Sequence, residues 1–354
     1  MRNYRPVFLL AAVLLIAGLC AAQSLVLELP RASQHAVVSQ RLGITDVSIT
    51  YHRPLVNNRK VWGTLVPYGQ VWRAGANENT IIAFSDPVLI EGKPLDKGTY
   101  GLFMIPAENE WTIIFSKNST SWGAFTYDQK EDALRVTVKP QASDPHDALT
   151  YDFDELKPDA TLVTLRWEKV AVPFKVSVDV PHLVQSSLEK QLRSLSQYTW
   201  ISWDEAANYV LDNKLDPQLA LTYSDKSIQN EERFENLITK SRTLERLDKK
   251  DEALALRNKA FEKGTPLQIH FYARQLQNDK RQDEAFAVFR SNAQKNPKAW
   301  VVHTGMARVY CGSGDFPNAV KEMKIAVDGA PDKAQKTYLE GLVRRLEAKE
   351  DINK

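Results

Sequence analysis

Hydrophobic and polar positions follow two different periods along this chain, and the change falls near Pro181. From Gln34 to about Val180, short segments alternate apolar and polar residues, or are rich in β-branched and aromatic ones, as β-strands are. They include Val47–Tyr51, Trp111–Phe115, Leu134–Val138 and Leu162–Trp167. Turn sequences rich in Gly, Pro and Asp separate these segments. This half is therefore predicted to form an antiparallel β sandwich or barrel.

After Pro181 the apolar residues recur with a helical period, and an internal repeat appears. Ala220, Ala253, Ala285 and Ala319 lie 33, 32 and 34 residues apart, and Gly314 marks a helix–helix turn. Repeats of about 34 residues with two helices each are typical of tetratricopeptide proteins, which this half resembles. About four repeats are expected from Ile201 to Pro331, with a closing helix near Asp332–Lys349. The alternative is an irregular helical bundle.

The predicted fold class is therefore α+β with segregated domains. An N-terminal antiparallel β sandwich or barrel precedes a C-terminal α-helical, tetratricopeptide-like solenoid. The expected boundaries are 1–22 for a signal peptide, 23–180 for the β domain, 181–200 for a linker or coupling helix, and 201–354 for the repeats and the closing helix.

The signal peptide is predicted from the order of its parts. Arg2 and Arg5 precede the apolar run Val7–Leu19, and Cys20-Ala21-Ala22 supplies small residues for cleavage after Ala22. The protein is therefore expected to be exported, either periplasmic or secreted. The alternative is a lipoprotein modified at Cys20, although Leu19 stands where that site has a small residue. No later segment reaches the length of a membrane span.

Composition narrows the function classes only slightly. The 354 residues are 43% hydrophobic and 25% charged, with a formal net charge of +2. These values are ordinary for globular domains and argue against broad electrostatic binding of nucleic acid. Without Cys20, Cys311 is the remaining cysteine, so no disulfide within the chain is expected.

The densest motif of the chain extends from Tyr51 to Glu78. It contains Tyr51-His52-Arg53-Pro54, Asn58-Arg59-Lys60-Val61-Trp62-Gly63, Val66-Pro67-Tyr68-Gly69 and Trp72-Arg73-Ala74-Gly75-Ala76-Asn77-Glu78. Together with Gly98–Phe103, Trp122-Gly123 and Asp132–Arg135, it resembles a bacterial exported family known as domain of unknown function 2911, over about Pro30 to Asp179. A tetratricopeptide-like region is a familiar companion in that family. The chain departs from the family at His52, where Ser is more usual, and at Asn58, where Gly is. The resemblance implies a domain and no activity.

The polar and aromatic residues of this motif have two interpretations. Arginine stays charged in proteins, so each guanidinium needs water, a carboxylate, a carbonyl or an aromatic face. In the first interpretation these contacts hold a long loop against the sheet. In the second they line a pocket for an anionic or polyhydroxyl ligand, with an aromatic stacking platform. The candidate ligand-binding residues are Arg53, Arg59, Tyr68, Trp72, Arg73, Asn77 and Glu78.

Motifs of catalysis and metal binding are absent from the sequence. It has no nucleophile elbow, no zinc-protease motif, no Walker A loop and no dinucleotide fingerprint. The histidines show no ligand spacing, although His35 and His52 could meet across neighbouring strands. No catalytic residue, metal or cofactor is therefore assigned, and a non-enzyme is favoured. The alternative is an envelope enzyme that acts on a glycan or another polar ligand at Arg53, Arg73 and Glu78.

One further pattern appears when the repeats are aligned by their alanines. Arg242, Arg274 and Arg308 fall at one equivalent position of successive first helices, and His270 lies on the same face. By resemblance to tetratricopeptide arrays, this position lines a groove, where stacked arginines favour an acidic segment or a C-terminal carboxylate. The alternative is that these arginines are exposed or paired within the chain.

The predicted function is that of an exported, non-enzymatic binding or scaffold protein. Its helical groove is expected to hold a protein or peptide partner, and its β domain a small polar ligand. A purely structural scaffold without a small-molecule site is the third possibility.

Overall fold

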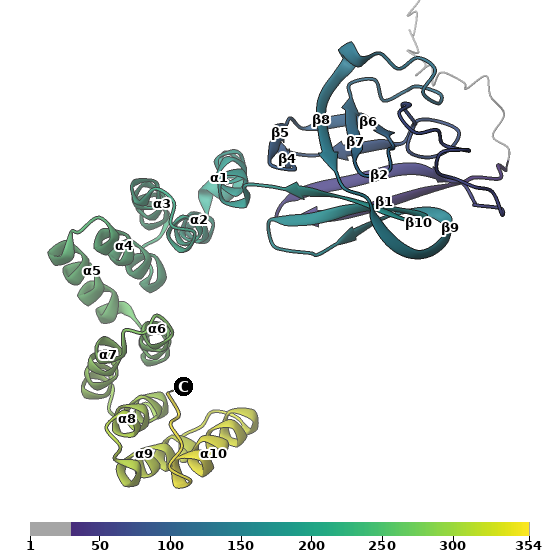
Figure 1. Cartoon of the computed structure of the whole chain (residues 1–354). Helices are drawn as coiled ribbons and strands as arrows, with labels where there is room; N and C mark the ends of the chain where they lie inside the picture. Colours follow the sequence, from purple (N-terminus) through teal and green to yellow (C-terminus); the bar gives the residue numbers. More distant parts are fainter. Residues whose placement is uncertain (1–29, 354) are drawn as a thin grey trace, which may run out of the picture. The chain divides into compact units, whose positions relative to one another are not determined.

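The computed structural model describes residues 30–353, and the described chain forms two compact units that divide between Val180 and Pro181 (Figure 1). The predicted signal peptide, its cleavage site after Ala22 and the alternative lipid attachment at Cys20 lie outside the described residues. Within the described part, no helix is long and apolar enough to cross a membrane.

The N-terminal unit consists of two antiparallel sheets, as the strand pattern predicted (Figure 1). The six-stranded sheet has the order β1-β2-β3-β6-β7-β8, and the four-stranded sheet has the order β5-β4-β10-β9. The strands are β1 (Gln34–Leu42), β2 (Thr45–Arg53), β3 (Ile81–Phe84), β4 (Val88–Ile90), β5 (Lys93–Leu95), β6 (Gly98–Ile105), β7 (Trp111–Ser116), β8 (Asp132–Val138), β9 (Gln141–Asp154) and β10 (Ala160–Ser177). A short 3-10 helix, Gln129–Glu131, precedes β8.

Alternation along the strands separates a core face from an outer face. In β2, Val47, Ile49 and Tyr51 are buried, whereas Thr50 and His52 lie on the opposite, partly exposed face. Tyr51 meets Tyr151 of β9 edge to face, with ring centroids 4.9 Å apart. Since β9 belongs to the other sheet, this contact shows that the two sheets pack face to face.

The loop between β2 and β3 contributes two tryptophans to this core. Trp62 meets Trp111 of β7 at 4.8 Å and Trp167 of β10 at 5.7 Å, and Trp72 stacks on Trp167 at 6.0 Å between ring centroids. The main chain of Trp72 also exchanges two hydrogen bonds with Met104 of β6, of 2.8 and 2.9 Å. The motif loop is therefore an integral part of the sandwich.

The C-terminal unit is helical throughout. Its elements are α1 (Val180–Gln191), the 3-10 helix Leu195–Tyr198, α2 (Trp200–Asp212), α3 (Pro217–Asn230), α4 (Phe234–Arg246), α5 (Lys250–Lys263), α6 (Pro266–Asn278), α7 (Gln282–Lys295), α8 (Trp300–Gly312), α9 (Phe316–Asp328) and α10 (Lys333–Glu347). From α2 to α9 they form four successive pairs, and α10 is the predicted closing helix. The tetratricopeptide-like arrangement is thereby confirmed.

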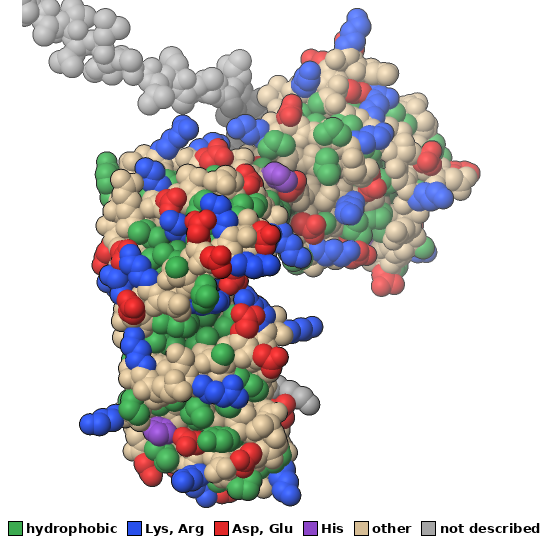
Figure 2. Space-filling model, turned by 90° about the vertical axis from the view of Figure 1, so that its left-hand side faces the viewer, with side chains coloured by type: hydrophobic (Ala, Val, Ile, Leu, Met, Phe, Trp, Pro, Cys, Tyr) green, Lys and Arg blue, Asp and Glu red, His purple; other side chains and the backbone are tan. Residues whose placement is uncertain are grey.

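Two features recur once in each helix pair. The aligned alanines lie in the second helices and are at most 1% exposed: Ala220, Ala253, Ala285 and Ala319. A left-handed residue ends each first helix and also follows α10: Lys214, Asp248, Lys280, Gly314 and Lys349, with φ between 55° and 77°. The small side chain allows the helices to approach closely, and the left-handed turn reverses the chain. Figure 2 shows acidic and basic side chains interspersed on the viewed face of the helical unit.

In the six-stranded sheet, Gly101 of β6 is the glycine that leaves least room for a side chain. A Cβ atom at this position would lie 2.3 Å from the carbonyl oxygen of Asn118 and 2.3 Å from Nδ2 of Asn79. We expect Gly101→Ala to lower the free energy of unfolding by about 3 kcal/mol, because the backbone of Asn118 has to move. The control is Gly69→Ala, where φ is 72° and the space is open. Gly69→Ala should lower the free energy of unfolding by about 1 kcal/mol, through backbone strain alone. Urea denaturation followed by tryptophan fluorescence measures both, and an equal loss would contradict the steric argument.

Candidate functional site

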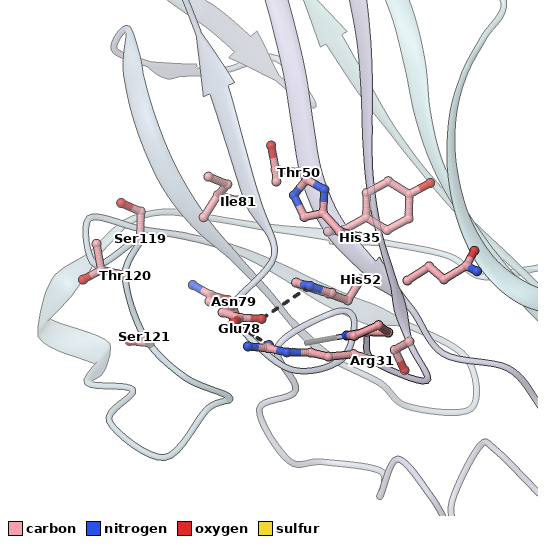
Figure 3. A pocket seen from close by; sticks show the side chains of 14 residues that line it. Arg31, His35, Thr50, His52, Glu78, Asn79, Ile81, Ser119, Thr120 and Ser121 are labelled. Atoms are coloured by element: carbon pink, nitrogen blue, oxygen red, sulfur yellow. Dashed lines mark hydrogen bonds and ion pairs between the residues drawn. The ribbon is translucent and has the colours of Figure 1, made fainter. Parts of the chain in front are cut away.

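An open pocket of about 760 Å³ lies on the outer face of the six-stranded sheet (Figure 3). Its floor is formed by His35 of β1, by Thr50 and His52 of β2, and by Ile81 of β3. These residues share one face because His35 pairs with His52, and Thr50 with Ile81, in the strand register. The segment before β1 and residues 119–121 after β7 form the walls.

An ion pair stands at one end of this pocket. Nη1 of Arg31 lies 2.5 Å from Oε1 of Glu78, and Nε2 of His52 lies 3.5 Å from Oε2 of the same carboxylate. Partial burial opposes ionisation of Glu78, but hydrogen bonds from Arg31 and from a backbone amide, with the nearby charges, lower its pKa. Burial lowers the pKa of His52 despite the Glu78 charge, so its imidazole is neutral at pH 7. The Arg31 guanidinium also lies 5.1 Å from the ring centroid of Trp122.

Asn79 is the most unusual side chain of the pocket. It is 6% exposed, and both its Oδ1 and its Nδ2 are buried without a hydrogen-bond partner within residues 30–353. Its backbone is fixed by a hydrogen bond of 3.0 Å from its amide to the carbonyl oxygen of Ser121. Figure 3 shows the side-chain amide turned toward residues 119–121. A buried carboxamide without partners is costly, which makes Asn79 a candidate ligand-binding residue.

Two of the arginines selected from the sequence hold the chain together. Nε of Arg53 donates to the carbonyl oxygen of Leu149, 3.0 Å away, and so connects β2 to β9. Arg59 donates to the carbonyl oxygens of Val56 and Leu55, at 3.0 and 2.5 Å, within its own loop. Both arrangements correspond to the first interpretation of the motif, in which arginines hold the loop.

The remaining motif residues outside the pocket serve local geometry. Trp72 belongs to the tryptophan cluster and donates from Nε1 to the carbonyl oxygen of Gly75, 3.2 Å away. Asn77 has a left-handed φ of 57°, and its Nδ2 donates to the carbonyl oxygen of Ser33 at 3.3 Å. Tyr68 is 42% exposed. Of the predicted ligand-binding residues, Glu78 alone is among those that line the pocket.

Arg73 is the exception among the motif arginines. Its Nε is buried and has no hydrogen-bond partner in the described part of the chain. Burial lowers the pKa of Arg73, and no carboxylate of the described residues offsets this shift. No hydrogen bond or ion pair between described residues joins Arg53, Arg73 and Glu78 to one another.

A second pocket, of about 410 Å³, lies along the first helices of the repeats, between α2, α4 and α6. Arg242, the first residue of the predicted arginine set, lines it but is already paired. Its Nη2 donates to Asp212 and its Nη1 to Asn208, both at 2.8 Å. We call this pocket the helical groove.

Two carboxylates in the helical groove retain a free oxygen. Oδ1 of Asp204 and Oε2 of Glu235 are buried and have no hydrogen-bond partner between residues 30 and 353. The pKa of Asp204 is raised to about 6, mainly by burial. The neighbouring Glu235 charge adds to this rise, and a hydrogen bond with Thr239 and the charge of Arg242 oppose it. The ring of Phe271, which is 62% exposed, lines the same groove.

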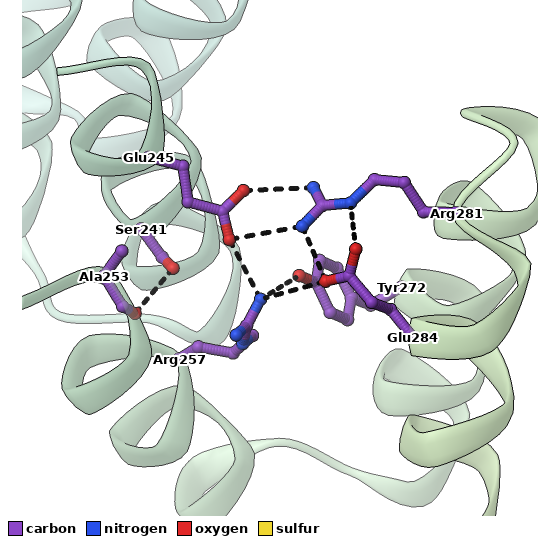
Figure 4. A network of polar contacts seen from close by, with 7 residues as sticks. All are labelled: Ser241, Glu245, Ala253, Arg257, Tyr272, Arg281 and Glu284. Carbon is purple, nitrogen blue, oxygen red and sulfur yellow. Dashed lines mark hydrogen bonds and ion pairs between the residues drawn. The ribbon is translucent and has the colours of Figure 1, made fainter. Parts of the chain in front are cut away.

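A network of charges joins the helix pairs beside the helical groove (Figure 4). Glu245 of α4 accepts from Arg257 of α5 and from Arg281 at the start of α7, at 3.0 Å each. Arg281 also forms two hydrogen bonds of 2.7 Å with Glu284. One carboxylate therefore connects two successive repeats.

The C-terminal segment covers the other end of the arginine set. Arg308 is 4% exposed and donates from Nη1 to the carbonyl oxygen of Ile352. Asn353 accepts a hydrogen bond of 2.8 Å from Gln277 of α6, whose own Oε1 accepts from Arg274 at 2.5 Å. We call residues 350–353 the C-terminal segment.

Cys311 and His270 are buried near this segment. The thiol of Cys311 is 5% exposed, and its Sγ accepts a hydrogen bond of 3.5 Å from the backbone amide of Ile352. His270 is 6% exposed, and burial together with the charges of Arg308 and Arg274 lowers its pKa to about 3. The proposal that Arg242, Arg274, Arg308 and His270 bind a partner stays a prediction.

Sequence reasoning did not identify several residues of these sites. Asn79 directly follows the motif that ends at Glu78, which was its only signal. Arg31 and residues 119–121 come from separate loops, and no spacing rule connects them with β2. Asp204 and Glu235 had no signal beyond their place on first helices.

Comparison with known proteins identifies the β domain. Residues 33–176 match the model of a family described as "Protein of unknown function (DUF2911)". The resemblance predicted from the motif is thereby confirmed, and the β domain is a domain of this family. No curated protein matches the chain.

The helical region is similar to solved structures. One is YrrB, described as "a TPR protein with an unusual peptide-binding site", with 16% identity, a TM-score of 0.26, and coverage of 46% of this chain and 84% of that one. Another is MamA, with 16% identity, a TM-score of 0.29, and coverage of 44% and 92%.

Replacing Arg53 and replacing Arg73 should have different effects on the free energy of unfolding. Arg53→Met removes the hydrogen bond to Leu149 and should lower the free energy of unfolding by about 1–3 kcal/mol. Arg73→Met removes a half-buried guanidinium whose buried Nε has no hydrogen-bond partner in residues 30–353, and should leave the free energy of unfolding unchanged or raise it. Chemical denaturation of the full chain compares the two variants. A large loss in Arg73→Met would show that its guanidinium has a structural partner.

Asp204 should make stability depend on pH. Its folded pKa of about 6 lies above the unfolded value of 3.8. The penalty for ionisation therefore grows as the pH rises between these values and is complete above 6. The stability gained by Asp204→Asn should be larger at pH 7.5 than at pH 4.5 by about 2 kcal/mol. Urea denaturation at both pH values measures this difference, and an equal gain at both would contradict the raised pKa.

Proposed function

We propose that this protein is an exported, non-enzymatic interaction protein whose helical unit binds an extended basic segment of a partner protein. The binding surface is the helical groove between α2, α4 and α6. The β domain accompanies it as a second recognition module. The signal-like sequence of residues 1–22 supports export to the periplasm or the exterior.

The observation that carries this proposal is the carboxylate of Asp204. It is buried, its pKa is raised, and one of its oxygens has no partner in residues 30–353. Such a group lowers the stability of the free protein. A cation or an N–H donor placed in the groove would remove this penalty, so the free oxygen supports a binding role.

The charges of the groove favour a basic partner segment over an acidic one. Among the described residues, Arg242 is the single arginine that lines the groove, and Asp212 neutralises it. Asp204 and Glu235 then remain as uncompensated carboxylates. The segment favoured by this balance therefore carries Lys or Arg, in contrast to the acidic segment expected from the stacked arginines.

The exposed ring of Phe271 supports the same partner chemistry. A long basic side chain has an apolar stem and a charged end. The stem would pack on Phe271, and the charged end would reach the carboxylate of Asp204 or Glu235. Alternating apolar and basic residues in the partner would use both features of the groove.

The enzyme alternative at Arg53, Arg73 and Glu78 receives less support from the geometry. Arg53 is engaged by Leu149, and Glu78 by Arg31 and His52. A general base needs a substrate proton within hydrogen-bond reach, and a shared substrate position needs convergent groups. Arg53 and Glu78 instead contact different partners and share none.

A binding experiment with two peptides tests the proposed function. The probes are fluorescently labelled decapeptides that alternate Leu with Lys or Leu with Glu, and fluorescence anisotropy measures their affinity for the full chain. We expect the Lys peptide to bind more tightly, and Asp204→Asn to weaken it about tenfold, as for loss of a charged contact. Binding should also weaken with salt.

Asp328→Asn is the matched control, since it removes the same charge from an exposed position at the end of α9. The Asp328→Asn variant should bind the Lys peptide with the same affinity as the unmodified protein. Preference for the Glu peptide, lost in the double variant Arg242→Ala/Arg274→Ala, would instead support binding by the arginine set. Equal affinities of Asp204→Asn and Asp328→Asn would refute the groove as the binding surface.

A further inference from the structure

We propose that the pocket on the outer face of β1, β2 and β3 binds a neutral polyhydroxylated ligand, that is, a sugar or a segment of a neutral glycan. This site belongs to the β domain and is independent of the helical groove. It differs from the arginine cluster suggested by the sequence, since Arg53, Arg59 and Arg73 are not among its lining residues.

The carboxamide of Asn79 is the first observation. Asn79 is 6% exposed, it lines the pocket, and neither Oδ1 nor Nδ2 has a hydrogen-bond partner in the described chain. A carboxamide presents one acceptor and one donor group side by side. Neighbouring hydroxyls of a sugar offer the complementary pair, since each hydroxyl both donates and accepts.

The charge balance of the pocket is the second observation. Arg31 and Glu78 are its only Lys, Arg, Asp or Glu lining residues among those described, and they neutralise each other at 2.5 Å. The imidazole of His52 is neutral at pH 7 because burial lowers its pKa. Neither an anion nor a cation would therefore find an uncompensated countercharge, and the pocket suits an uncharged polar ligand.

The third observation is the kind of group that surrounds Asn79. Thr50, Ser119 and Thr120 bring hydroxyls to the pocket, and Ile81 supplies an apolar surface. This mixture of donors, acceptors and a small apolar area corresponds to the alternating hydroxyl and C–H surfaces of a sugar ring. The volume of about 760 Å³ also lies within the roughly 300–1,000 Å³ of small-ligand sites.

A peptide is less suited to this pocket. Extended peptides bind sheets by pairing with the main chain of an edge strand. The pocket instead lies across the side-chain face of β1, β2 and β3. β1 is an edge strand of this sheet, but the pocket floor is built from side chains of all three strands. Side-chain groups, and not backbone groups, are offered to the ligand here.

An array of oligosaccharides tests the proposal with the full chain as the probe. The array carries neutral cello-, malto-, xylo-, manno- and chito-oligosaccharides together with acidic glycans, and a tryptic digest of casein provides the peptide comparison. We expect binding to at least one neutral series. Calorimetry should then give an affinity that changes less than twofold between 50 and 500 mM NaCl, because no net charge is involved.

Two variants connect this binding to the pocket. Asn79→Leu keeps the approximate volume but removes the carboxamide, and Thr50→Val removes one hydroxyl without changing the shape. Each should weaken binding of the identified oligosaccharide at least tenfold. The thermal midpoint of Asn79→Leu should not fall, because the carboxamide has no partner in the free protein. Thr112→Val, in β7 of the same sheet and outside the pocket, is the matched control and should bind normally.

The proposal is overturned by any of four results. These are no binding to neutral oligosaccharides at millimolar concentration, binding to acidic glycans alone, capture of casein peptides without any oligosaccharide, and unchanged affinity in both Asn79→Leu and Thr50→Val. Since the helical groove is not touched by these variants, the outcome is independent of the peptide experiment.

Discussion

The β domain depends on the contact of four tryptophans between its sheets. Trp111 and Trp167 come from opposite sheets, and Trp62 and Trp72 come from the loop between β2 and β3. Large aromatic rings bury much apolar area and pack in defined orientations. The contact orders a loop of more than twenty residues, and the buried aromatic area offsets the conformational entropy lost in ordering it. Because the loop ends at Glu78 and Asn79, its fixed course also determines where the pocket residues stand.

Both proposed sites contain buried polar groups without a hydrogen-bond partner in residues 30–353, and such groups also occur elsewhere in the fold, for example at Thr45 and Trp62. Asn79 in the pocket and Asp204 in the helical groove occupy positions where an apolar or amide side chain would be less costly. Most polar groups in the same units are engaged, as Arg53 and Arg242 illustrate. Groups that lower the stability of the free protein are typical of binding sites, where a ligand supplies the missing partner. Arg73 shares this property but lies outside both pockets.

The sequence predicted those features that depend on contacts between residues near one another in the chain. Strand alternation and the helical repeat depend on residues near in sequence, so the two sheets, the helix pairs and the turn at Gly314 were predictable. The equivalent left-handed turns at Lys214 and Lys280 carry no glycine signal. The pocket required the register that brings His35 beside His52, together with two loops that no period describes. The arginine set was placed correctly on first helices, but its pairing with Asp212 and with the C-terminal segment is long-range.

The position of Cys311 beneath the C-terminal segment provides a natural reporter of local motion. Its thiol is buried, and the amide of Ile352 lies against it. A thiol-specific reagent can reach this sulfur only after the segment has lifted from α8. The labelling rate of Cys311 in the folded protein therefore reports how often the C-terminal segment lifts, without any engineered probe.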